Sequence, residues 1–150
     1  MAFLDSDQGG PAVSRGNAVA AVASELNIQL THIHAAPSAD AAREATKVLL
    51  DGPKDIDGLF AFNDLMAAGS LKALWDLGRA VPEDCAVIGI DGIPLGELVT
   101  PELTTLALGL RTVRRAAVGL LDGLLAGAVE PDNTDARLTL QHQLVVRQSA

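Results

Sequence analysis

The sequence predicts an α/β domain in which helices flank a mostly parallel, doubly wound sheet. Short apolar runs alternate along the chain with longer segments whose apolar residues recur every three or four positions, which is typical of strand and helix units in series. Two runs, Gly58 to Phe62 and Cys85 to Ile90, are apolar at nearly every position, as strands covered on both faces are. With 150 residues, 49% of them hydrophobic, the chain can build such a core.

The first third of the chain predicts two strands and two helices in alternation. A short apolar opening, Ala2 to Asp5, precedes a Gly-Gly-Pro turn and a helix from about Ser14 to Leu26. Residues Ile28 to His34 form the next predicted strand. A helix from about Ala39 to Leu50 follows Pro37 and Ser38, and Asp51-Gly52-Pro53 ends it.

The middle of the chain repeats this pattern. Gly58 to Phe62 predicts a buried strand, and a helix from about Leu65 to Leu77 should turn Leu71, Leu74 and Trp75 inward until Gly78 ends it. Cys85 to Ile90 predicts the next strand. A short helical piece near Pro94 to Leu98 and a strand at Leu103 to Leu106 follow.

The last third predicts one long helix and one strand. The apolar residues between Leu110 and Leu125 follow helical spacing and leave the opposite side polar, so this helix is amphipathic. A loop at Pro131 to Asp135 leads to a final strand, Leu138 to Val146, where apolar and polar residues alternate.

Composition and charge exclude several classes of function. A net charge of −8 argues against non-specific attraction to nucleic-acid phosphates, and one Trp, three Phe and no Tyr leave little for an aromatic stacking surface. The chain contains no run of about 20 apolar residues that a membrane helix needs, and its first ten residues lack the basic start of a signal peptide. The single cysteine fits a reducing compartment. We therefore expect an intracellular, cytoplasmic protein without a membrane partner.

Four polar residues stand where ligands bind in parallel sheets, beyond the carboxyl ends of the strands. Asn63 and Asp64 follow one predicted strand, Asp91 follows the next, and Arg15 lies near the start of the first helix. An amide, a carboxylate and a guanidinium in one cleft suit sugar hydroxyls or the polar edge of another small metabolite.

Each of these residues also has a purely structural interpretation. Asn63 or Asp64 could cap the helix that begins at Leu65, because a side-chain oxygen there accepts from unpaired backbone amides. Asp91 and Gly92 could form only a turn, and Arg15 could be an ordinary exposed helix residue. The residues alone leave these alternatives open.

Four ordered segments resemble the effector-binding core of LacI/GalR-type transcription regulators. They are Gly58 to Leu74 (GLFAFNDLMAAGSLKAL), Leu77 to Leu95 (LGRAVPEDCAVIGIDGIPL), Pro101 to Leu106 (PELTTL) and Leu144 to Ser149 (LVVRQS). The resemblance implies one lobe of a type I periplasmic-binding-protein-like fold, and the stretch before residue 58 matches more weakly.

By this resemblance, Arg15, Asn63 and Asp91 contact a small sugar-like or nucleoside-like effector, with Asp64 beside them. Two positions depart from the family pattern: Ala36 and Pro37 stand where many members place an aromatic residue, and Leu108 stands where sugar-binding members often have Gln. A galactoside or a purine is therefore not the expected effector.

The resemblance also implies a divided domain organisation. Residues of about 1–106 and 138–150 would form the C-terminal lobe, whereas the helix of about 110–127 would belong to an absent N-terminal lobe, with crossovers near Thr105 to Gly109 and Ala136 to Leu140. We expect that helix to fold back on this lobe or to pack against another copy of the chain. The expected partners are a second copy in a homodimer, and DNA only through a missing headpiece. With one wall of the cleft, the chain alone should bind effector weakly or not at all.

The remaining candidate residues predict no catalysis, metal or cofactor. Arg111, Arg114 and Arg115 suit a solvated helix face better than a nucleic-acid patch. His32 and His34 point to one face of a strand, but the spacing shows no further metal ligand and favours a structural role. Cys85 is expected to be an unreactive core thiol.

Two rival functions remain. One is a solute-binding protein of a sugar transport system, which shares the two-lobed architecture and would need an export signal. The other is an enzyme on a doubly wound sheet, such as a small nucleotide-using transferase or a phosphoacceptor domain. A phosphoacceptor domain would need an acidic cluster at one strand end and a Lys at another.

Overall fold

A computed structural model describes residues 1–8, 11–52, 55–130 and 136–150. The elements, in chain order, are β1 (Ala2–Ser6), α1 (Pro11–Glu25), β2 (Thr31–Ala35), α2 (Ala39–Leu50), β3 (Gly58–Ala61), α3 (Asp64–Asp76), β4 (Ala86–Asp91), the 3-10 helix η1 (Pro94–Glu97), β5 (Thr104–Ala107), α4 (Leu110–Leu125) and β6 (Gln143–Val145). The predicted order of elements is confirmed over these residues. The turn predicted at Gly9-Gly10 and the loop predicted at Pro131 to Asp135 lie outside them.

Within the described residues, the strands form one sheet in the order β2-β1-β3-β4-β5-β6. All neighbouring pairs from β2 to β5 are parallel, and only β6 runs antiparallel, against β5. Strand β2 lies on one side of β1, and β3, the next strand in sequence, lies on the other side of β1. The strand order therefore reverses at β1, which makes the gap between β1 and β3 the topological switch point.

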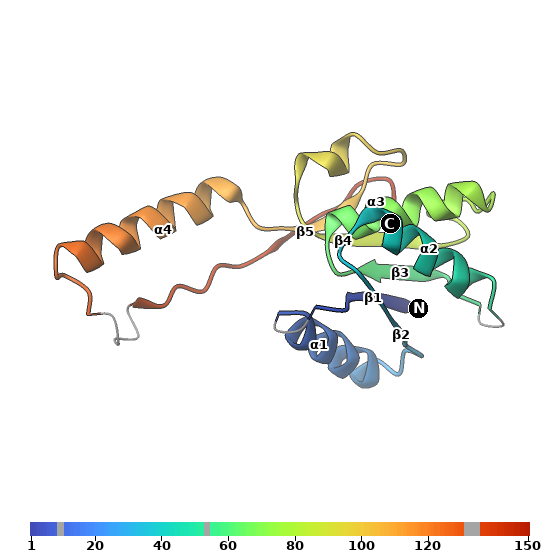
Figure 1. Cartoon of the computed structure of the whole chain (residues 1–150), viewed down its shortest axis with the longest axis horizontal. Coiled ribbons are helices and arrows are strands. Elements are labelled where there is room, and N and C mark those ends of the chain that lie inside the picture. Colours follow the sequence, from blue (N-terminus) through green and yellow to red (C-terminus); the bar gives the residue numbers. More distant parts are fainter. Residues whose placement is uncertain (9–10, 53–54, 131–135) are drawn as a thin grey trace.

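Helices cover both faces of the sheet, which confirms the doubly wound architecture (Figure 1). Helices α2 and α3 pack together on one face, and α1 lies on the other. The main core fills the α2 and α3 side with small and aliphatic residues from β1, β3 and β4, among them Leu4, Leu59 and Val87. Part of the reason that the helices start where they do is local: the side chains of Ser38 and Asn63 accept hydrogen bonds from the first turns of α2 and α3.

The prediction that Trp75 turns inward is wrong. Helix α3 buries Leu71 and Leu74, but the Trp75 side chain is 75% exposed. The buried stripe of α3 is centred on Ala67, Ser70 and Leu74, and Trp75 lies one helical step beyond it.

The predicted strand from Leu138 to Val146 is only partly confirmed. Residues 143–145 form β6, whereas residues 136–142 run along α4, away from the sheet, and none of the described strands pairs with them (Figure 1). Strand character depends on such a neighbour, and alternation of apolar residues cannot supply one.

Helix α4 has the predicted length but does not fold back on the sheet. It projects from the rest of the molecule on two connecting segments, near residues 108–109 and 136–142 (Figure 1). None of its residues is buried, and Leu125 is 80% exposed. Among the described residues, no helix is both long and apolar enough to cross a membrane.

Candidate functional site

The predicted site residues follow the strands on either side of the switch point. Arg15 lies in α1, directly after β1; Asn63 and Asp64 begin α3, after β3; and Asp91 ends β4. Because β1, β3 and β4 are parallel neighbours, their carboxyl ends lie at one edge of the sheet. We call Arg15, Asn63 and Asp91 at this edge the rim.

The Arg15 side chain reaches from α1 to Phe62, which directly follows β3. Its Nη1 atom donates a hydrogen bond of 2.7 Å to the Phe62 carbonyl oxygen, and its guanidinium carbon lies 4.5 Å from the centre of the Phe62 ring. Its Nη2 atom lies 3.8 Å from Asp91 Oδ1. The side chain is thus fixed by Phe62, and its separation from Asp91 is longer than a direct hydrogen bond.

Asn63 has the structural role that the sequence suggested, and it also lies at the rim. Its Oδ1 atom accepts a 2.8 Å hydrogen bond from the Met66 amide and so caps α3. Within the described part of the chain, its Nδ2 group has no hydrogen-bond partner, and the residue is only half-buried. The cap uses only the oxygen of the amide, so the Nδ2 group keeps its donor capacity.

Asp64 lies beneath the rim instead of on it. Its carboxylate is fully buried, and it accepts a 2.6 Å hydrogen bond from Thr105 Oγ1 and a 2.8 Å hydrogen bond from the Ile93 amide. An ideal Cβ atom on Gly89 would collide with Asp64 Oδ1, so the glycine makes room for this carboxylate. Asp64 therefore ties α3 to β5 and to the loop after β4, and it has no free surface for an effector.

Asp91 combines an unusual backbone with a perturbed carboxyl group. Its φ angle is +116°, in a region of backbone conformation that residues other than glycine rarely occupy. Burial raises the pKa of Asp91, with a further contribution from the Asp64 carboxylate, whereas Arg15 and the neighbouring His142 act to lower it. Backbone strain and a partly desolvated carboxylate at one residue are typical of a functional site.

Three residues that sequence reasoning did not single out complete the site. Phe62 holds Arg15, Thr105 donates a hydrogen bond to Asp64, and His142 lies near enough to Asp91 to affect its pKa. Phe62 directly precedes Asn63, so an aromatic residue next to a rim residue was the available signal. Thr105 and His142 are distant in sequence, and only the fold shows their place.

The two departures from the family pattern lie at the same edge of the sheet. Ala36 is exposed and Pro37 half-buried just after β2. The Leu108 amide donates a 3.5 Å hydrogen bond to the Asp91 carbonyl oxygen, so the backbone of Leu108 lies beside Asp91.

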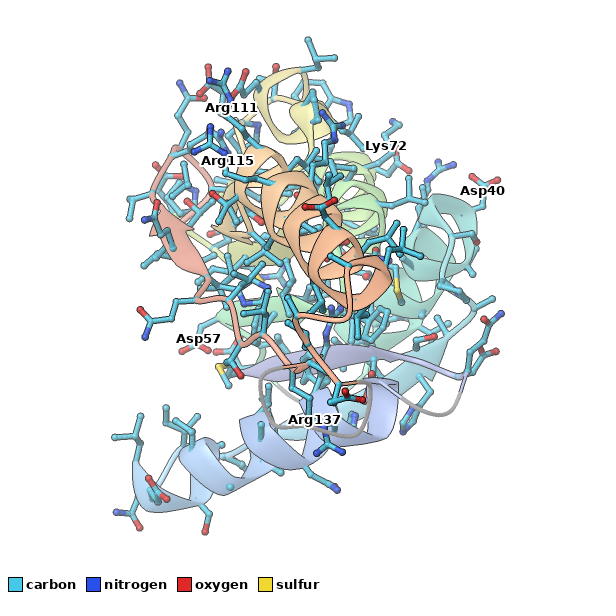
Figure 2. All side chains as sticks on the ribbon, turned by 90° about the vertical axis from the view of Figure 1, so that its left-hand side faces the viewer. Asp40, Asp57, Lys72, Arg111, Arg115 and Arg137 are labelled. Atoms are coloured by element: carbon cyan, nitrogen blue, oxygen red, sulfur yellow. The ribbon has the colours of Figure 1, made fainter. Side chains whose placement is uncertain are left out.

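The weaker candidates resolve in different ways. Arg111, Arg114 and Arg115 are exposed, and Figure 2 shows Arg111 and Arg115 near each other on α4, so the solvated helix face stays a prediction. Cys85 is buried, and burial raises the pKa of its thiol to about 11, as expected of an unreactive core thiol. His32 and His34 lie close to the buried carboxylate of Asp5, a neighbour that sequence spacing did not reveal.

A family model described as the periplasmic binding protein-like domain matches residues 1–150. Among curated proteins, the chain is 36% identical over 111 residues to the HTH-type transcriptional regulator CelR of Thermobifida fusca, covering 73% of this chain and 32% of that protein. It is 46% identical over 66 residues to the ribose operon repressor of Halalkalibacterium halodurans, covering 44% of this chain and 20% of that protein. The chain thus spans a third or less of the length of these relatives.

Solved structures with a similar fold come from the same kind of protein as these curated relatives. A LacI family transcriptional regulator from Arthrobacter sp. FB24, in complex with lactose, is 55% identical to this chain with a TM-score of 0.94, covering 99% of this chain and 55% of that one. A CelR–cellobiose complex is 27% identical with a TM-score of 0.83, covering 98% of this chain and 46% of that one. The chain therefore belongs to the periplasmic-binding-protein-like domain family, and its relatives are LacI/GalR-family transcriptional regulators.

Proposed function

We propose that this chain is part of the effector-binding core of a LacI-type transcription regulator that senses a small sugar through Arg15, Asn63 and Asp91. The observation that supports this most is the Arg15–Asp91 pair. The two side chains are 3.8 Å apart, and Arg15 is held by Phe62, so both keep hydrogen-bonding capacity for a third partner.

The chemistry of the rim suits neighbouring hydroxyl groups. The guanidinium donates in a planar fork, the carboxylate accepts at two oxygens, and the Asn63 amide can donate beside them. Each hydroxyl of a sugar both donates and accepts, so one sugar can satisfy all three side chains. Related structures with bound lactose and cellobiose support a sugar, and the regulator relatives favour this function over transport and over catalysis. Lactose is itself a galactoside, so its titration also tests the expectation from Ala36, Pro37 and Leu108 that the effector is not a galactoside.

In the proposed regulator, ligand binding shifts an equilibrium between two arrangements of a homodimer, and a DNA-binding segment outside this sequence responds to that shift. Such a protein works in the cytoplasm. Residues of about 1–106 and 138–150 form one lobe, and α4 packs against a second lobe that supplies the other wall of the cleft. The unburied surface of α4 and the two connections that carry it away from the sheet support this division.

The function is tested by nuclear magnetic resonance on the whole 150-residue chain. Lactose, cellobiose and ribose are each titrated to tens of millimolar, with adenine, which carries no sugar, as the comparison up to its solubility, while backbone, Arg Nε and Asn Nδ2 signals are followed. We expect one of the sugars to shift the signals of Arg15, Asn63 and Asp91 and those of their neighbours. Because one wall is present, we expect an affinity weaker than micromolar.

Two variants make the test specific. Arg15→Ala should abolish the shifts, whereas Arg79→Ala, which removes an exposed arginine after α3, should leave them unchanged. Shifts that map away from the rim, or that persist in Arg15→Ala, would contradict the site. A micromolar affinity would contradict the one-walled cleft.

A further inference from the structure

We propose that Asp5, His32 and His34 form a binding site for a divalent transition-metal ion of the Zn²⁺ type. Each of the three offers one ligand atom, and these atoms all lie within 4.8 Å of one another. None of the three belongs to the rim, and the proposed sugar site does not use them.

Strand geometry brings the three side chains together. His32 and His34 are two residues apart on β2, so both point to the same face of the sheet, and their ring centres are 4.5 Å apart. The register of β1 against β2 places Asp5 directly opposite His34. The Asp5 Oδ2 atom lies 2.9 Å from His32 Nε2. Paired strands are a stiff support for such a site.

The donor set selects the class of ion. Two imidazole nitrogens and one carboxylate oxygen suit Zn²⁺ and its neighbours in the first transition row, whereas Mg²⁺ and Ca²⁺ prefer oxygen ligands alone. Three protein ligands leave a further coordination position for water, as in exchangeable zinc sites. His34 and the edge of β2 are exposed, so that position faces solvent.

Two of the ligands are already held in place. Asp5 is 2% exposed, and its Oδ1 atom accepts a hydrogen bond from the Ser6 amide; the His32 ring packs against Phe3 with ring centres 5.4 Å apart. The first turns of α1 close the inner side, since an ideal Cβ atom on Gly16 would lie 2.6 Å from Asp5 Oδ2.

The exposed residue His34 supplies the third protein ligand. A tetrahedral zinc ion holds its ligand atoms about 3.4 Å apart, and the three ligand atoms here already lie within 4.8 Å of one another, so small side-chain movements bring them to that spacing.

A hydrogen bond between Asp5 and His32 alone would also explain the burial of the carboxylate. That interpretation gives His34 no role. The experiment therefore turns on His34, an exposed side chain whose removal leaves the Asp5–His32 pair intact.

The test uses the whole chain without a histidine tag, freed of metal by EDTA and titrated with ZnCl₂ by calorimetry and with CoCl₂ by visible absorption. We expect one ion per chain and a Co²⁺ spectrum with imidazole ligation. His34→Ala should weaken Zn²⁺ binding about tenfold or more. His142→Ala removes the remaining histidine of the chain and should leave the affinity unchanged.

A second variant keeps the proposal testable if one substitution disturbs the fold. Asp5→Asn retains an oxygen for His32 but removes the anionic ligand, and it should weaken binding to a similar extent, with circular dichroism confirming the fold. Absence of stoichiometric binding, equal affinity of the parent chain and His34→Ala, or loss of binding in His142→Ala would each overturn the proposal.

Discussion

Asp91 is the residue where fold stability and the proposed function oppose each other. Burial raises the pKa of its carboxyl group, so the native state holds that proton more tightly than the unfolded chain, whose value is near 3.8. The protonated carboxyl group stabilises the fold fully when the pH is below the pKa of Asp91 in the unfolded chain. This stabilisation is lost as the pH rises through the higher pKa of Asp91 in the native state. At neutral pH the ionised Asp91 therefore weakens the fold.

Asp91→Asn should accordingly raise the midpoint of urea unfolding at pH 7. As the pH falls toward 3.8, the advantage of the variant should shrink, because the parent carboxyl then binds its proton. Urea titrations of both chains between pH 7.5 and pH 4.5 measure this difference. A variant that is less stable than the parent chain at pH 7 would show that the ion pair with Arg15 outweighs the burial.

Gly89 tests the support beneath the rim. Gly89→Ala adds a methyl group against the buried Asp64 carboxylate, and we expect a loss of about 1–3 kcal/mol in the free energy of unfolding. Gly119→Ala is the matched control, because its added methyl group meets open space on α4, and it should stabilise the helix by about 0.5–1 kcal/mol or leave the chain unchanged. Equal effects of the two substitutions in urea titrations would contradict the packing described for Asp64.

The elements that the sequence predicted best are those defined by local signals. Helices α2 and α3 match their predicted bounds within one residue, because Ser38 and Asn63 cap them and the spacing of their apolar residues is regular. The predicted strand from Leu138 to Val146 is longer than β6, because strand pairing depends on a neighbouring strand that is distant in sequence. The site residues also differ in whether local signals could predict their place. Strand ends pointed to Asn63 and Asp91, but the burial of Asp64 required knowledge of Gly89 and Thr105.

Helix α4 is the element whose stability can be measured separately. None of its residues is buried, and an isolated helix of this length is marginal in water. In hydrogen exchange at low protein concentration, we expect the α4 amides to exchange orders of magnitude faster than those of β1, β3 and β4. Protection of α4 equal to that of the sheet would show that α4 packs against this lobe.

At the scale of the whole molecule, we expect the apolar face of α4 to determine how copies of the chain interact. Val118, Leu121 and Leu125 are all exposed along this helix, and a surface of that kind favours association. Two antiparallel α4 helices can cover each other's apolar faces around a twofold axis, which closes the contact at a dimer. The isolated chain would then use a second copy to cover the face that we assign to the other lobe.

Sedimentation equilibrium should therefore give an average mass that rises with concentration from monomer to dimer and no further. The double substitution Leu121→Asp with Leu125→Asp places charge on that face and should hold the chain as a monomer at every concentration tested. Leu26→Asp, at an exposed apolar residue just after α1, should leave the association unchanged. A parent chain whose mass stays that of a monomer at every concentration would contradict this arrangement. So would a Leu26 variant that dissociates as readily as the α4 variant, because association would then follow from apolar exposure in general and not from the α4 face.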